Sequence, residues 1–104
     1  MKYEEEKLQI NSASNRLELE IEGSTAFIEY KLAGHTLFLI HTEVPHELEG
    51  KGVGAAIVQK ALQHAKDSGY KIVPICPFVQ AYLERHKEWN GIVAPDADRF
   101  LNKL

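Results

Sequence analysis

Residues 39–56 read LIHTEVPHELEGKGVGAA. This stretch begins as a buried strand, continues through a short glycine-rich turn and ends at the start of an amphipathic helix. The first N–H groups of a helix lack intrahelical partners, and the positive end of the helix dipole lies there, so such a junction is suited to binding an anion. Gly50, Gly52 and Gly54 permit positive φ angles and a close approach of the backbone to a phosphate. The stretch predicts a site for phosphate or pyrophosphate.

The spacing of the glycines differs from that of two common nucleotide-binding loops. A P-loop of the form G-x-x-x-x-G-K-[ST] has a lysine and a hydroxyl residue directly after its last glycine, whereas Ala55 and Ala56 follow Gly54. A dinucleotide-binding fingerprint reads G-x-G-x-x-G and has an acidic residue about 20 positions further on. The segment GKGVG has a different spacing and lies in the middle of the chain. Neither of these sites is indicated.

The residues before this stretch are patterned as antiparallel strands. Leucine or isoleucine alternates with polar residues around Leu8 and again from Leu17 onward, which is typical of strands with one solvated face. The last of these strands has a continuous apolar start, which predicts burial on both faces and a central position in the sheet. The predicted strands lie at about 8–10, 17–22, 26–32 and 36–44, with turns at 11–15, 22–24 and 33–35.

The residues after the glycine-rich turn predict two main helices. Val53, Ile57, Ala61 and Ala65 form one apolar stripe of the first helix, and Gly69 is a suitable residue to end it. A strand that follows a crossover helix is expected to run parallel to the strand before it. The predicted elements are helices at about 52–68 and 78–87, a strand at 71–75 and a short terminal helix at 96–104. The order is ββββ-α-β-α, an α+β (α/β) fold in a single domain of residues 1–104.

Three segments together resemble the GCN5-related N-acetyltransferases, and most closely the very short branch of that family. The pyrophosphate loop of the family reads Q/R-x-x-G-x-G/A, and Glu49, Gly52 and Gly54 take its three defined places. The other two segments are HTEVP at 41–45 and PICPFV at 74–79. The resemblance covers about residues 17–89. It implies a minimal fold of this family and transfer of an acetyl group to an amine.

The resemblance also implies acetyl-CoA (CoA) as the cofactor, bound where the fourth and fifth strands splay apart. The pantetheine arm would pair with the backbone of Thr42, Glu43 and Val44, and a backbone N–H of the fourth strand would polarise the acetyl carbonyl. Glu49 replaces the usual Gln or Arg, and an acid beside a pyrophosphate is expected to weaken binding unless its side chain turns outward. The implied cofactor-binding residues are Thr42, Val44, Gly50, Lys51, Gly52, Val53, Gly54, Ala55 and Phe78.

Acetyl transfer from a thioester to an amine requires an acid for the leaving thiolate, and Cys76 and Tyr82 are the two candidates. Cys76 lies at the end of the fifth strand, where its thiol could protonate the thiolate or attack the thioester; the alternative is a buried structural cysteine. Most relatives use a tyrosine of the last helix, which Tyr82 matches, although Leu83 aligns there equally well. Tyr82 could also be a core-packing ring.

His41 and Glu43 are candidates for the base that takes a proton from the amine. The two side chains share one face of the fourth strand because side chains alternate, and histidine titrates nearest to neutral pH. The alternative is a hydrogen-bonded histidine and an exposed carboxylate. The spacing of His41 and His46 fits no standard ligand set, so no metal site is expected.

The composition is that of a soluble globular protein, with 44% hydrophobic and 26% charged residues among 104. We expect neither a membrane span nor a signal peptide, because no apolar run is long enough for the first and three glutamates rather than an apolar segment follow residue 3. The net charge of −3 argues against non-specific nucleic-acid binding. Cys76 cannot form an internal disulfide and is compatible with a reducing compartment. We expect a cytoplasmic monomer or weak homodimer, without nucleic-acid or membrane partners.

Four functions are consistent with the sequence. The leading interpretation is an acetyl-CoA-dependent N-acetyltransferase, an acyltransferase whose acceptor is a small amine or a protein lysine. The second is a CoA-binding module without efficient catalysis. The third is a thioesterase-like or redox protein that uses Cys76 with His41 and hydrolyses acetyl-CoA without an amine. The fourth is a structural domain in which the glycine-rich segment is only a turn, and which binds no CoA.

Overall fold

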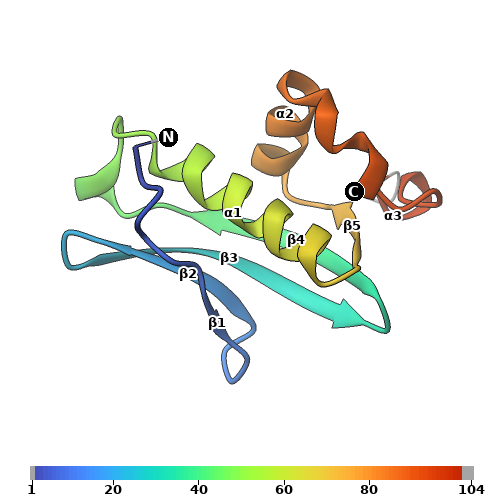
Figure 1. Ribbon diagram of the computed structural model, residues 1–104, viewed down its shortest axis with the longest axis horizontal. Coiled ribbons are helices and arrows are strands. Elements are labelled where there is room, and N and C mark those ends of the chain that lie inside the picture. Colours follow the sequence, from blue (N-terminus) through green and yellow to red (C-terminus); the bar gives the residue numbers. More distant parts are fainter. Residues whose placement is uncertain (1, 102–104) are drawn as a thin grey trace.

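The computed structural model describes residues 2–101, which form a five-stranded sheet in the order β1-β2-β3-β4-β5 (Figure 1). The first four strands are antiparallel neighbours, and β5 pairs with β4 in parallel. The parallel pair follows from the crossover through α1, since a helix returns the chain to the same end of the sheet. The strands are β1 (Gln9–Asn11), β2 (Arg16–Ile21), β3 (Ser24–Ala33), β4 (Thr36–Glu43) and β5 (Lys71–Pro74).

The helices α1 (Val53–Asp67) and α2 (Pro77–Arg85) cover one face of this sheet (Figure 1). The predicted apolar stripe of α1 is buried against the strands, and Pro77 occupies the first turn of α2. The remaining elements are two short 3-10 helices, η1 (His46–Leu48) and η2 (Lys87–Ile92), and the single-turn helix α3 (Asp98–Leu101). The predicted order ββββ-α-β-α and the α+β fold class are confirmed.

The hydrophobic core lies mainly between the sheet and α1. A second, smaller core lies on the other face of the sheet, where Val73 packs with Ala94 and Ala97. The rings of Phe38 and Phe100 meet edge to face there, with centroids 5.0 Å apart. Leu37 and Leu39 point to the α1 side and are fully buried, so β4 has apolar contacts on both faces.

The structure differs from the sequence-based prediction in four details. The fourth strand is not the central strand, because β3 lies in the middle of the sheet and β4 lies next to the parallel edge strand. Helix α2 ends at Arg85 rather than near residue 87, since His86 leaves helical geometry at φ −131° and ψ 70°. Of the predicted terminal helix at 96–104, Asp96 and Ala97 are not helical, Asp98–Leu101 are, and residues 102–104 lie outside the described residues. Gly54 has no positive φ, because it lies inside α1.

No helix within residues 2–101 combines the length and the apolarity that crossing a membrane requires.

Candidate functional site

Strands β4 and β5 separate at the middle of β4. Their pairing runs from Thr36 opposite Lys71 to Leu39 opposite Pro74, and it ends with a 2.9 Å hydrogen bond from the Cys76 N–H to the Leu39 carbonyl. Beyond this point β4 continues along β3 to Glu43, whereas the segment after β5 turns away into α2. The backbone of residues 41–43 therefore has a strand partner on one side only, which is β3. This arrangement is the splay that the resemblance implied.

A β-bulge lies at the same point of β4. Leu39 is opposite Tyr30 and His41 is opposite Glu29, so Ile40 is an extra residue without a partner on β3. A bulge bends its strand and re-aims the side chains on either side. This bulge lies next to Leu39, the last residue of β4 that pairs with β5, so it coincides with the start of the splay.

The segment between β4 and α1 presents free N–H groups at the start of the helix. Gly50 and Gly52 have φ angles of 76° and 78°, and Gly52 is the N-cap residue of α1. Among the described residues, the N–H groups of Gly52, Val53 and Gly54 have neither a capping side chain nor a backbone acceptor. The first turn of α1 also contains no acidic residue. Free donors and the positive end of the helix dipole are the features that hold a phosphate group.

A cavity of about 330 Å³, here called the loop cavity, lies in front of this helix start. Phe78 forms one wall, and its ring lies against Gly54: a Cβ at Gly54 would be 2.7 Å from Phe78 Cζ. Gly54 therefore serves close packing rather than an unusual φ angle. Seven of the nine predicted cofactor-binding residues line the cavity. Its lining comprises Val44, Leu48, Glu49, Gly50, Gly52, Val53, Gly54, Ala55 and Phe78.

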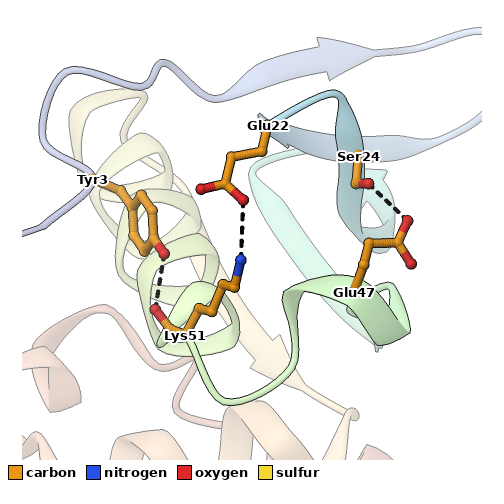
Figure 2. Close-up of polar contacts among 5 residues, drawn as sticks. All are labelled: Tyr3, Glu22, Ser24, Glu47 and Lys51. Carbon is orange, nitrogen blue, oxygen red and sulfur yellow. Dashed lines mark hydrogen bonds and ion pairs between the residues drawn. The ribbon is translucent and has the colours of Figure 1, made fainter.

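The other two predicted cofactor-binding residues make contacts elsewhere. Thr42 Oγ1 lies 3.3 Å from Cys76 Sγ. Lys51 Nζ forms an ion pair with Glu22 at 3.0 Å, and the Lys51 carbonyl accepts a hydrogen bond from the Tyr3 hydroxyl at 2.9 Å (Figure 2). The Lys51 ammonium is thus already paired with a carboxylate.

Glu49, the acidic departure from the family pattern, is turned outward. Its side chain is exposed, and Glu49 Oε1 lies 3.6 Å from His46 Nδ1. The carboxylate can be partly neutralised when His46 is protonated. Solvent therefore screens the charge of the exposed Glu49 carboxylate near the loop cavity.

Cys76 is buried at the point where β4 and β5 separate. The residue is 3% exposed, and its Sγ is in hydrogen-bond contact with the Thr42 hydroxyl on the α1 face of β4. Gln80, one helical turn later, donates from Nε2 to the carbonyls of Pro74 and Ile75 at 2.9 and 3.2 Å. These contacts fix the end of β5 and the start of α2 around the thiol.

His41 and Glu43 lie together on the opposite face of β4. Their side chains are 3.5 Å apart between Nε2 and Oε2 and are both more than half exposed. Residues directly opposite on neighbouring strands share a face, so Thr42, opposite the buried Ile28, points to the other side. The backbone of β4 therefore separates the predicted bases from Cys76.

Tyr82 lies in a third place, on a neighbouring cavity of about 400 Å³. Its ring stacks on His86 with centroids 4.1 Å apart, whereas Leu83 is buried in the core. Burial and, to a smaller extent, the Glu88 carboxylate raise the pKa of the Tyr82 phenol. This tyrosine cavity is lined by Lys2, Tyr3, Lys51, Gly52, Ala55, Ala56, Gln59, Tyr82 and His86.

Sequence reasoning missed Tyr3, Glu22 and Gln80. Tyr3 and Glu22 reach the loop from positions 48 and 29 residues away in the chain, and no local pattern marks such contacts. Gln80 carries a weak signal, since it lies four residues after Cys76 in the helix that begins there. Within residues 2–101, no group of three or more potential metal ligands is found.

Comparison with known proteins identifies the family. The model of the GCN5-related N-acetyl-transferases matches residues 16–92, well over half of the chain. A protein from Staphylococcus aureus, determined by NMR in solution and described as a GCN5-like candidate N-acetyltransferase, has a similar fold with a TM-score of 0.63 and 26% sequence identity. That match covers 85% of this chain and 89% of the other. Both similarities support acetyltransferase activity in general terms. The chain belongs to the family of GCN5-related N-acetyltransferases.

Proposed function

We propose that this protein is an acetyl-CoA-dependent N-acetyltransferase that acts on a small amine or a protein lysine. The observation that carries the proposal is the position of the loop cavity. It joins the uncapped N-terminus of α1 to the end of the splayed strand β4, in a chain of this family. A pyrophosphate at the loop would then lie next to a strand edge that could hold the pantetheine arm, since Val44, which lines the cavity, directly follows β4.

The described residues fit this ligand. The N–H groups from Gly50 to Ala55 would hold the pyrophosphate, and the backbone of Thr42 to Val44 would hold the pantetheine arm. The bound cofactor supplies an activated thioester. Lys51 would act through its backbone, because its ammonium is paired with Glu22. Phe78 forms an apolar wall beside the phosphate-binding groups.

The reaction moves two protons, and the candidate residues lie on the two sides of β4. The amine nitrogen forms a bond to the acetyl carbon, the C–S bond breaks, the amine loses a proton and the departing sulfur gains one. His41 or Glu43 would accept the first proton from the exposed face. Cys76 would supply the second from the buried face. Tyr82 is the other candidate donor, since a phenol is protonated at neutral pH and burial raises the pKa of this one further.

The separation of these residues favours a second candidate function, a CoA-binding module without efficient catalysis. Cys76, the His41–Glu43 pair and Tyr82 lie in three different places. Such a module would bind acetyl-CoA and CoA as the enzyme does, but it would release no CoA in the presence of amines.

Calorimetric titration of the native chain with acetyl-CoA and CoA tests the binding site. Gly52→Asp is expected to weaken binding by about 100-fold or more, because like charges about 4 Å apart near a protein surface repel by up to about 4 kcal/mol. Gly52→Asn is the matched control, since it has the same shape and the same φ requirement but no charge. Equal losses in the two variants would assign the effect to backbone strain. No binding by the native chain would remove the proposal.

Release of CoA then separates the functions. An N-acetyltransferase releases CoA only when an amine from a broad panel is present, and Cys76→Ala lowers its kcat by about 100-fold if the thiol is the proton donor. Release of CoA without any amine, abolished in Cys76→Ala, would instead indicate cysteine-dependent hydrolysis. Binding with no release under either condition would indicate the module.

A further inference from the structure

Tyr3 connects the N-terminal segment to the loop before α1. Although it lies near the start of the described chain, its side chain is only 9% exposed and belongs to the main core. Its hydroxyl donates to the carbonyl of Lys51 at 2.9 Å, across 48 residues of sequence (Figure 2). Lys51 is the residue between the two loop glycines with positive φ, Gly50 and Gly52.

This hydrogen bond fixes the orientation of one peptide unit. In a planar trans peptide the C=O and the following N–H point in opposite directions. A Lys51 carbonyl held toward Tyr3 therefore directs the Gly52 N–H away from Tyr3. Gly52 lines both the loop cavity and the tyrosine cavity, and Tyr3 lines only the second of these, so the side away from Tyr3 is that of the loop cavity.

Glycine makes the opposite orientation accessible. Rotation of the peptide between Lys51 and Gly52 would carry Gly52 from φ 78° to a negative φ, and glycine adopts both signs readily. The rotated peptide would direct its carbonyl oxygen, the negative end of its dipole, toward the loop cavity. A phosphate group there would be repelled rather than bound.

The two neighbouring polar contacts hold the segment but do not select this orientation. Lys51 Nζ binds Glu22 at 3.0 Å and Glu47 accepts a hydrogen bond from Ser24 Oγ at 2.7 Å (Figure 2). The two contacts tie side chains of the segment to the turn after β2 and to the first residue of β3. Neither contact involves the Lys51 carbonyl, which is held by the hydrogen bond from the Tyr3 hydroxyl.

We propose that Tyr3 is a positioning residue for the pyrophosphate loop: its hydroxyl holds the peptide between Lys51 and Gly52 with the N–H toward the ligand. This inference rests on the proposed function. It assigns a part of the cofactor site to the N-terminal segment, outside the residues that the family model matches.

Tyr3→Phe tests the proposal, since it removes the hydroxyl and keeps the buried ring. The dissociation constant for acetyl-CoA is expected to rise about fivefold to tenfold, the usual effect of losing one net hydrogen bond. Binding of S-acetylpantetheine, which has the thioester and the arm but no pyrophosphate, is expected to be unchanged in an NMR titration. Tyr70→Phe, which removes a phenol hydroxyl beyond the other end of α1, is the control and should alter neither constant.

Two results would overturn the proposal: unchanged acetyl-CoA binding in Tyr3→Phe, or an equal loss for both ligands, which would indicate a general structural role. If the native chain binds no acetyl-CoA, the proposed function fails, and a ligand-free measurement decides the role of Tyr3. Backbone ¹⁵N relaxation dispersion of Tyr3→Phe should then show microsecond-to-millisecond exchange confined to residues 50–54. A loop as rigid as in the native chain would exclude control of this peptide by Tyr3.

Discussion

Gly54 shows how the absence of one carbon atom shapes the candidate site. The ring of Phe78 occupies the place where a side chain at Gly54 would begin, and this ring is 46% exposed and free to move outward. The glycine lets an aromatic ring lie directly on the first turn of α1. The contact therefore sets the width of the loop cavity more than it sets the stability of the fold.

Gly54→Ala is accordingly expected to separate affinity from stability. The added methyl group displaces the Phe78 ring, and the dissociation constant for acetyl-CoA should rise about tenfold, or about 1.4 kcal/mol. The free energy of unfolding should change by less than about 1 kcal/mol, since alanine is the better helix former by a similar amount. Calorimetry and urea denaturation measure the two quantities. Gly91→Ala is the control, because a Cβ there meets nothing within 4 Å. A large loss of stability with unchanged affinity in Gly54→Ala would mean that the contact with Phe78 serves the fold rather than the loop cavity.

Tyr82 is the residue whose titration should be visible in the stability of the protein. Its folded-state pKa is raised, first by burial and then by Glu88. Below pH 10 the phenol is neutral in both states; above it, the unfolded chain ionises first, so the free energy of unfolding falls as the pH rises toward the folded-state pKa. Tyr82→Phe should remove this component, and Glu88→Gln should lower the Tyr82 pKa.

The absorbance of tyrosinate in an alkaline titration measures this pKa, and the difference between the native chain and Tyr82→Phe isolates it. Glu84→Gln is the matched control for Glu88→Gln, since Glu84 lies on α2 with Tyr82, and it should leave the Tyr82 pKa unchanged. An equal shift in both variants would mean that the net charge, rather than Glu88, sets the value.

Among the secondary-structure elements, β5 and α2 are joined at the splay by one side chain. The Gln80 amide donates to two successive carbonyls, those of Pro74, the last residue of β5 that pairs with β4, and of Ile75, which follows it. Gln80→Leu leaves both carbonyls without this donor and should lower the free energy of unfolding by about 1–3 kcal/mol. Urea denaturation measures the loss. Gln63→Leu, which removes only an exposed contact with Asp67, should change the free energy of unfolding by less than about 0.5 kcal/mol. Equal losses in the two variants would argue against a role of Gln80 in joining β5 to α2.

For the molecule as a whole, the proposed cofactor should act as a stabiliser. The loop cavity combines β4, the loop, α1 and α2, so it exists only in the folded chain. Acetyl-CoA at about 100 times its dissociation constant should therefore raise the free energy of unfolding by about 2.7 kcal/mol. Urea denaturation with and without ligand measures this, and Gly52→Asp should show no increase. If calorimetry shows binding but the urea midpoint of unfolding does not change, the ligand must bind the unfolded chain as well as the folded one.

Local patterns in the sequence were sufficient to predict the order of the elements. The alternation from Leu17, the stripe from Val53 and the position of Pro77 all reflect contacts within one element, which periodicity reports directly. The middle position of β3 and the extra residue Ile40 depend on pairing between strands. No single strand carries that information.

The candidate site was predictable to the extent that it lies in one segment. Residues 50–55 are contiguous, and the glycines mark the helix start. The contact of Gly54 with Phe78, the pairing of Lys51 with Glu22 and the bond from Tyr3 join distant parts of the chain. They depend on how the elements pack, so a reading of each segment by itself could not predict them.

The three contacts in Figure 2 have a consequence for the order in which the molecule assembles. They join residues 23, 29 and 48 positions apart, and each needs a long stretch of chain to be closed before it forms. The loop has no side-chain cap of its own at the start of α1. We therefore expect it to take its final shape late in folding, after the sheet and α1 have come together, so that a partly folded chain would offer no binding site to the cofactor.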